Sequence, residues 1–114
     1  MDHKDLDVWK KSIEIITEIY SITANFPNEE KYGIVSQIRR AAVSIPSNIA
    51  EGCARYSDKE NIRFLDIASG SLAELETQLI ISKNLGFIES DDIINKLYPI
   101  SQMISGLKRH LKSK

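Results

Sequence analysis

The chain has 114 residues, of which 42% are hydrophobic and 27% are charged, and its formal net charge is −1 at pH 7. This length and composition are typical of a single folded domain and argue against a disordered chain. The nearly neutral total argues against a strongly basic nucleic-acid-binding protein and leaves room only for a local basic cluster.

The first predicted helix runs from about Asp5 to Asn25, where apolar residues recur at steps of three and four. They form two stripes on well-separated sides of the helix. The first stripe consists of Leu6, Trp9, Ile13, Ile16 and Tyr20, and the second of Val8, Ile15, Ile19, Ile22 and Phe26. A helix in a monomeric bundle needs one such face, so the other predicts a contact between subunits. The pattern leaves open which stripe faces the core, and we assign the second stripe to the oligomer interface.

The second predicted helix runs from about Asn28 to Ala54 and contains Pro46. Its core stripe consists of Val35, Ile38, Ala42, Ile45 and Ile49. Pro46 has no N–H, and its ring presses on the carbonyl of Ala42. We expect the helix to continue through Pro46 with a kink, and Ser44 or Asn48 to hydrogen-bond to the freed carbonyl.

The remaining helices have clear start and stop signals. Ser57 and Glu60 form the pattern of a capping box that begins a third helix, Asp58 to about Asn84, and Gly86 is placed to end it. A fourth helix begins at Ser90 to Asp92 and is expected to bend at Pro99. Four helices with short connections predict an all-α, up-down-up-down four-helix bundle, kinked at Pro46 and Pro99, that forms one domain over residues 1–114.

Two sets of polar residues are candidate sites. The first lies beside the core stripe of the second helix and consists of Ser44, Asn48, Glu51 and Arg55, with Glu74 across the bundle. We interpret it as a structural hydrogen-bonded network, with a binding site as the alternative. The second is a basic strip near the corner between helices two and three, made of Arg39, Arg40, Arg55, Lys59 and Arg63. A solvated surface is the favoured interpretation of this strip, and contact with nucleic acid is the alternative.

Catalytic chemistry has little support in the sequence. A di-metal carboxylate site would draw on Glu51, Glu74 and Glu76, but the Glu-x-x-His pairs of such bundles are missing. Cys53, the single cysteine, has no evident histidine partner, and no glycine-rich phosphate loop is present. We therefore expect no catalytic, metal-binding or cofactor-binding residues and no enzymatic activity. A single cysteine cannot form an internal disulfide, which fits a reducing cytoplasm. The sequence also has no apolar leader and no apolar run long enough to span a membrane. We therefore expect a cytoplasmic protein without a membrane partner.

Two segments carry a resemblance to a known family. They are QIRRAAVSIPSNIAEG at residues 37–52 and RYSDKENIRFLDIASGSLAELETQL at residues 55–79. The chain resembles the bacterial four-helix-bundle proteins encoded in intervening sequences of 23S ribosomal RNA genes. Their relatives include the accessory variability determinant proteins of diversity-generating retroelements. The resemblance implies a ring-shaped homopentamer. For the strongly basic retroelement relatives it also implies binding to nucleic acid and a reverse transcriptase, whereas this chain is slightly acidic.

These observations predict a non-enzymatic scaffold or adaptor that self-assembles into a ring. The alternative is a nucleic-acid-binding accessory protein, for RNA or DNA, that acts through basic residues repeated around the oligomer.

Overall fold

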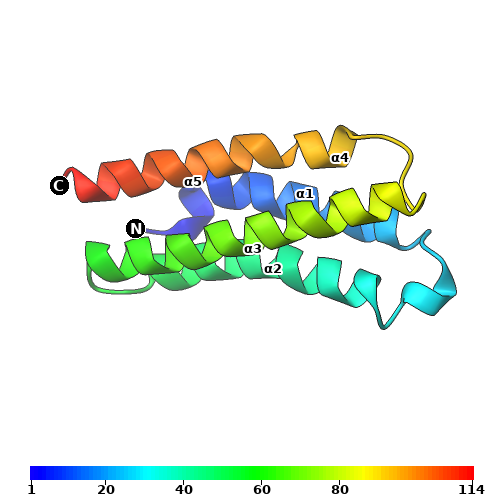
Figure 1. Cartoon of the computed structure of the whole chain (residues 1–114). Helices are drawn as coiled ribbons and strands as arrows, with labels where there is room; N and C mark the ends of the chain where they lie inside the picture. The colour runs from blue at the N-terminus through cyan, green and yellow to red at the C-terminus, as the bar shows by residue number, and fades with distance from the viewer.

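The computed structural model describes all residues, 1–114, and consists of helices without any strand. Three long helices, α1 (Asp7–Thr23), α2 (Ile34–Cys53) and α3 (Asp58–Asn84), are followed by the short α4 (Asp92–Asn95) and by α5 (Leu97–Lys112). Consecutive rods run in opposite directions, and α4 with α5 forms the fourth rod (Figure 1). The predicted four-helix bundle is thus confirmed. No helix is both long enough and apolar enough to cross a membrane.

The order of the helices around the bundle places two grooves on opposite sides. α1 packs against α2 and α5, and α3 packs against the same two helices, with α2 and α3 in the most extensive contact. The groove between α1 and α2 therefore lies opposite the groove between α3 and α5. Both chain ends and the α2–α3 corner share one end of the bundle, and the α1–α2 and α3–α4 connections share the other (Figure 1).

The rotation of α1 contradicts the predicted oligomer interface. The stripe assigned to that interface faces the core of its own chain: Val8, Ile15, Ile19 and Phe26 are buried, and Ile22 is half-buried against them. Ser12 and Thr23 complete this buried side, because each hydroxyl donates to a carbonyl of its own helix, Val8 at 2.7 Å and Ile19 at 2.8 Å. Polar side chains whose hydrogen bonds are formed within their own helix can be buried beside apolar residues. The assignment is wrong, and the other stripe is the one that faces outward.

The first two helices are shorter than predicted. A turn of 3₁₀ helix, His3–Asp5, precedes α1, and the Asp2 carboxylate caps it by accepting from the Lys4 N–H at 2.9 Å. Another turn, Asn28–Glu30, takes the place of the expected start of α2. Gly33 has φ −105° and ψ −115°, outside the helical region, so α2 begins only at Ile34.

The ends of α3 follow the prediction closely. The Ser57 hydroxyl accepts from the Glu60 N–H at 3.1 Å, although the Glu60 carboxylate binds Arg63 instead of returning to the cap. At the other end Gly86 has φ +81°, and the Phe87 N–H donates to the Ser82 carbonyl at 2.9 Å. This is the glycine-terminated helix end expected from the sequence.

The two prolines behave differently. α2 is continuous through Pro46, as predicted, but Asn48 donates to the Ser44 carbonyl at 2.8 Å. The expectation that Ser44 or Asn48 serves the carbonyl of Ala42 is therefore wrong, and the kink itself stays a prediction. The fourth rod is interrupted at Lys96, so Pro99 occupies the first turn of α5, where its missing N–H has no intrahelical partner to lose.

A glycine allows α2 and α3 to approach closely near their shared corner. A Cβ built on Gly52 would lie 2.6 Å from Oδ1 of Asn61 and 3.0 Å from Cβ of Phe64. Asn61 and Phe64 are both buried in α3, so neither can move aside freely. The absence of a side chain at Gly52 is thus a packing requirement of the bundle.

We expect Gly52→Ala to lower the free energy of unfolding by about 1–3 kcal/mol, because it overpacks the α2–α3 contact. The matched control is Gly70→Ala, since a Cβ on Gly70 would meet nothing within 4 Å. That change should stabilise the helix by about 0.5–1 kcal/mol. Urea unfolding followed by circular dichroism measures both, and equal stabilities for the two variants would contradict the packing role of Gly52.

Candidate functional site: the α1/α2 groove

The outward stripe of α1 lines an open groove against α2. Near the chain termini the groove is apolar, and its main residues are Trp9, Ile13 and Ile16 from α1 and Val43, Pro46 and Ala50 from α2. Ile13 is 40% exposed and Val43 42% exposed, which is high for large apolar side chains on facing helices. We call this part the apolar half of the α1/α2 groove.

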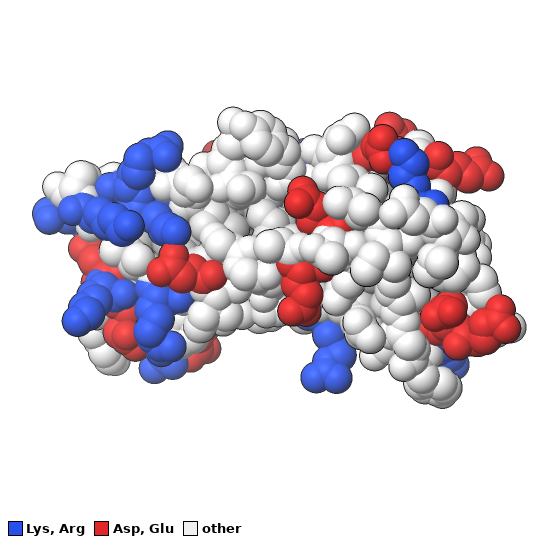
Figure 2. Space-filling model, viewed as in Figure 1, with Lys and Arg blue, Asp and Glu red and all other residues white.

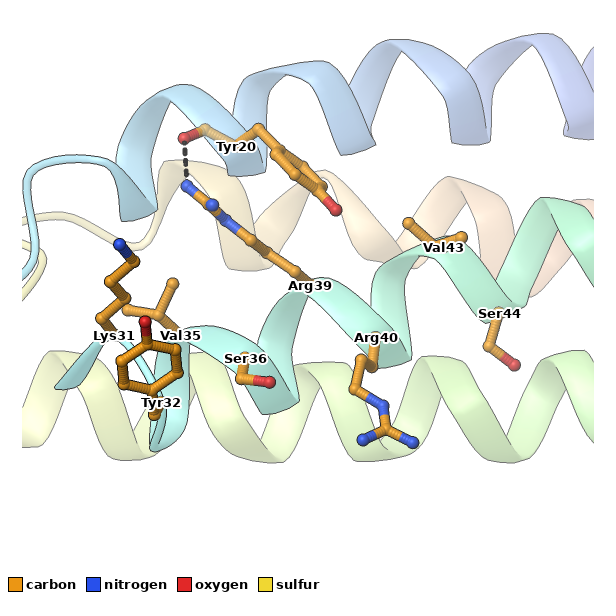
Figure 3. A pocket seen from close by; sticks show the side chains of 9 residues that line it. All are labelled: Tyr20, Lys31, Tyr32, Val35, Ser36, Arg39, Arg40, Val43 and Ser44. Atoms are coloured by element: carbon orange, nitrogen blue, oxygen red, sulfur yellow. Dashed lines mark hydrogen bonds between the residues drawn. The ribbon is translucent and has the colours of Figure 1, made fainter.

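Val43 also belongs to the continuation of the groove toward the other end of the bundle. Besides Val43, the side chains that line this part of the groove include Tyr20, Lys31, Tyr32, Arg39 and Arg40 (Figure 3). Tyr32 is 89% exposed. Three cations line this part and no acid does, so we call it the basic half.

Arg39 is held in place by α1. Its Nε donates to Oγ1 of Thr23 at 3.0 Å, and its Nη2 donates to the Tyr20 carbonyl at 3.2 Å (Figure 3). The guanidinium also lies 4.4 Å from the centroid of the Tyr20 ring. These contacts tie the end of α1 to α2, so Arg39 has a structural role in addition to its charge.

Arg40 points away from Arg39 and toward the α3 side of α2 (Figure 3). It is exposed and belongs to none of the eight ion pairs of the structure. Arg55 lies fifteen residues further along the sequence, about 22 Å at the rise of an α-helix. The predicted basic strip is therefore not one cluster, because Arg39 and Arg40 lie apart from the other three residues.

Arg55 and Arg63 meet at the α2–α3 corner over a shared aromatic ring. Their guanidinium carbons lie 4.9 Å and 4.5 Å from the centroid of Phe64. Arg55 pairs with Glu51, and Arg63 pairs with Glu60, with N–O distances of 3.1 and 3.2 Å in the second pair. The hydrogen bond from Arg63 lowers the pKa of Glu60, and the same bond raises the pKa of Arg63. The acids of this corner thus offset part of its basic charge.

Charge is nevertheless unevenly distributed along the bundle. On the face drawn in Figure 2, lysine and arginine side chains gather at the end where α3 begins and α5 ends, with several acids among them, and acidic side chains are prominent toward the opposite end. The last turn of α5 contributes Arg109, His110 and Lys112, preceded by Lys108, which pairs with Asp66 at 2.7 Å. We call this end of the bundle the basic end.

The predicted polar network is smaller than expected and has a different partner across the bundle. Nδ2 of Asn48 donates to the carbonyl and to Oγ of Ser44, at 2.8 and 2.9 Å, and Oγ of Ser44 lies 2.8 Å from Oγ of Ser71. Glu74 is exposed and takes no part in this network, and Glu51 with Arg55 forms a separate surface pair. Ser71 was missed as a partner, and the sequence signal that could have found it is the cluster of small residues Ala68, Gly70, Ser71 and Ala73, which lets another helix come close. The bond between Ser44 and Ser71 joins α2 to α3, and the two bonds from Asn48 hold Ser44 within α2. This arrangement favours the structural interpretation.

Comparison with known proteins places the chain in a family. The family described as 23S rRNA-intervening sequence protein matches residues 4–106. The chain belongs to this family. A comparison with curated proteins found no match. The matched range of the family includes all of α1, α2 and α3 and most of α5, and therefore both halves of the α1/α2 groove.

The groups considered for catalysis are not brought together. No three histidine, cysteine or carboxylate side chains lie close enough to hold a metal ion. Cys53 is half-buried, and this burial raises the pKa of its thiol. The nearby N-terminal ammonium opposes the shift, while Asp2 adds to it. A raised pKa leaves less thiolate at neutral pH, so the thiol is a weaker nucleophile than a free cysteine.

We expect Ser44 and Ser71 to be coupled in stability by about 0.5–1.5 kcal/mol, because their hydroxyls share a hydrogen bond between helices. A double-mutant cycle of Ser44→Ala and Ser71→Ala, measured by urea unfolding, gives this coupling. Ser47 provides the control, since its hydroxyl donates to Val43 of its own helix at 2.8 Å. Ser47→Ala and Ser71→Ala should be additive, and an additive Ser44–Ser71 pair would contradict the bond.

Proposed function

We propose that the protein is a non-enzymatic scaffold that self-assembles into a ring through its α1/α2 groove. The observation that carries this proposal is the outward apolar stripe of α1, which faces exposed Val43 across the groove. The other side of α1 fills the core of the bundle, and Trp9 and Ile16 are only partly buried against that core, which leaves Ile13 and Val43 exposed. A second copy of the chain would cover them.

Burial of this stripe supplies the driving force for assembly. Apolar surface removed from water contributes about 25 cal/mol per Å². If the grooves of two subunits paired with each other, the contact would form a two-fold dimer and no groove would remain to extend it into a ring. A ring needs a heterologous contact, in which this groove meets a different surface of the next subunit. The resemblance to known bundle proteins implies five subunits, and the relation to the retroelement accessory proteins stays a prediction.

A ring of identical subunits presents the same surface several times on one rim. Weak contacts that are linked in this way gain avidity, by about 10²-fold or more where the geometry allows simultaneous binding. This property is what a scaffold or adaptor needs, and it requires no catalytic group.

We expect Ile13→Lys combined with Val43→Lys to reduce the oligomer to smaller particles, because two charges would be buried in the contact. Both side chains are already exposed in the single chain, so the bundle itself should remain folded. Sedimentation velocity measures the mass, and circular dichroism checks the fold. Ile67→Lys is the matched control, since Ile67 is 41% exposed but lies on α3 outside the groove.

Two results would contradict the proposed assembly. One is a wild-type protein that sediments as a monomer at every concentration tested. The other is a double variant that keeps the wild-type mass.

Nucleic-acid binding is a second candidate function, favoured by the basic end of the bundle. Lys59 and Lys112 are exposed there and make no ion pair. In a ring whose subunits all point the same way, these side chains would be repeated on one rim and would act together on a polyanion.

We expect Lys59→Glu combined with Lys112→Glu to weaken binding of a structured RNA and to make that binding less sensitive to salt. Each phosphate contact that is lost should lower the slope of log K against log salt by about 0.7–0.9. Fluorescence anisotropy at low and moderate salt measures this slope, and sedimentation velocity checks that the variant keeps the wild-type mass. If the protein does not bind RNA at low salt, nucleic-acid binding is refuted and the scaffold is the one proposed function that remains.

A further inference from the structure

We infer that the basic half of the α1/α2 groove docks on the α3/α5 groove of a second copy, with Arg40 of one subunit facing Glu76 of the next. This inference rests on the proposed self-assembly and names the surface that covers the groove. It also sets the direction in which neighbouring subunits point.

The two grooves have complementary charge. The basic half is lined by Lys31, Arg39 and Arg40 and by no acid, with Arg40 at its edge on the side of α2 nearer α3 (Figure 3). The α3/α5 groove is lined by Leu72, Ala73, Leu97 and Tyr98 among others, and Glu76 is its only charged residue. Glu76 is exposed and makes no ion pair within the chain. Each groove therefore carries charge that its own chain does not neutralise.

The charges also lie at the same height along the bundle. The bond between Ser44 and Ser71 fixes one level at which α2 and α3 meet. Because the two helices are antiparallel and rise equally per residue, positions at equal steps from this bond share a level. Glu76 lies five residues after Ser71, and Arg39 and Arg40 lie five and four residues before Ser44. A neighbour that points the same way thus brings Glu76 level with these arginines.

Opposite charges also lie at similar levels further along the bundle, toward the end away from the chain termini. Lys31 precedes α2 at the end of the bundle where the α3–α4 connection lies (Figure 1). That connection bears Glu89, which is exposed and makes no ion pair, and Asp91, which pairs with Lys83 at 2.6 Å. A parallel neighbour therefore presents two unpaired acids, Glu76 and Glu89, to the basic half of the groove.

Charge also argues against a contact in which two parallel bundles pair groove with groove. A two-fold dimer of parallel bundles would set Lys31, Arg39 and Arg40 against the same three residues of its partner. Like charges in a partly desolvated contact cost several kcal/mol. The heterologous, parallel arrangement avoids this repulsion and buries the apolar half of the groove as well.

A charge swap tests the contact. Arg40→Glu and Glu76→Arg should each raise the dissociation constant of the assembly by about tenfold or more, because each sets like charges against one another. The chain that carries both substitutions should recover most of the wild-type affinity. Arg39 is left unchanged, since it also fixes Tyr20. Sedimentation velocity over a concentration series gives the dissociation constants.

The controls are the same charge changes at exposed sites outside the contact. Lys59→Glu lies at the basic end, and Glu74→Arg lies two residues from Glu76 but outside the α3/α5 groove. Both should leave the dissociation constant unchanged.

The outcomes separate this inference from the proposed assembly. If Arg40→Glu and Glu76→Arg leave the dissociation constant unchanged, or if the double swap fails to restore it, the docking of these two grooves is refuted. The scaffold proposal still stands in that case, provided that Ile13→Lys with Val43→Lys reduces the mass. A monomeric wild-type protein would overturn the assembly itself.

Discussion

The close approach of α2 and α3 is the constraint on which the rest of the structure depends. Gly52 lies directly against Asn61 at one level, and Ser44 and Ser71 share a hydrogen bond further along. Two such points fix both the height of one helix against the other and the rotation of each about its own axis. This rotation turns Val43 and Arg40 outward and leaves Ile45 and Ile49 in the core. The α1/α2 groove is therefore a consequence of a contact made on a different side of α2.

Features set by neighbouring residues could be predicted from the sequence, and features set by packing between helices could not. The cap at Ser57 and the end at Gly86 depend on hydrogen bonds within a few residues, so the bounds of α3 were predicted correctly. The rotation of α1 depends on which side fits against α2 and α5. Both stripes of α1 consist of large apolar residues, so the pattern does not decide between them, and the buried side also includes Ser12 and Thr23. Only their bonds to carbonyls of the same helix make that side compatible with a core.

The two candidate sites differ in the same way. Ser44 and Asn48 were grouped correctly because residues four apart on a helix are neighbours in space. Their partner across the bundle is Ser71 and not Glu74, since helices in such close contact leave room only for short side chains between them. The basic strip was drawn from residues close in sequence number. An α-helix rises about 1.5 Å per residue, so residues fifteen positions apart are far apart in space. Arg40 and Arg55 therefore lie near different parts of the bundle.

The nearly neutral total charge conceals a separation of charge that the topology creates. The basic last turn of α5 suits the negative end of the helix dipole, and the acids that precede and begin α4 suit the positive end. Because α4 and α5 form one rod, these local preferences place the basic last turn of α5 at one end of the bundle and the acids around the start of α4 at the other. An isolated bundle gains little from this arrangement, since exposed charges are screened over about 10 Å. In a ring of parallel subunits the same charges would form two rims of opposite sign, and the direction of each subunit would decide which rim a partner meets.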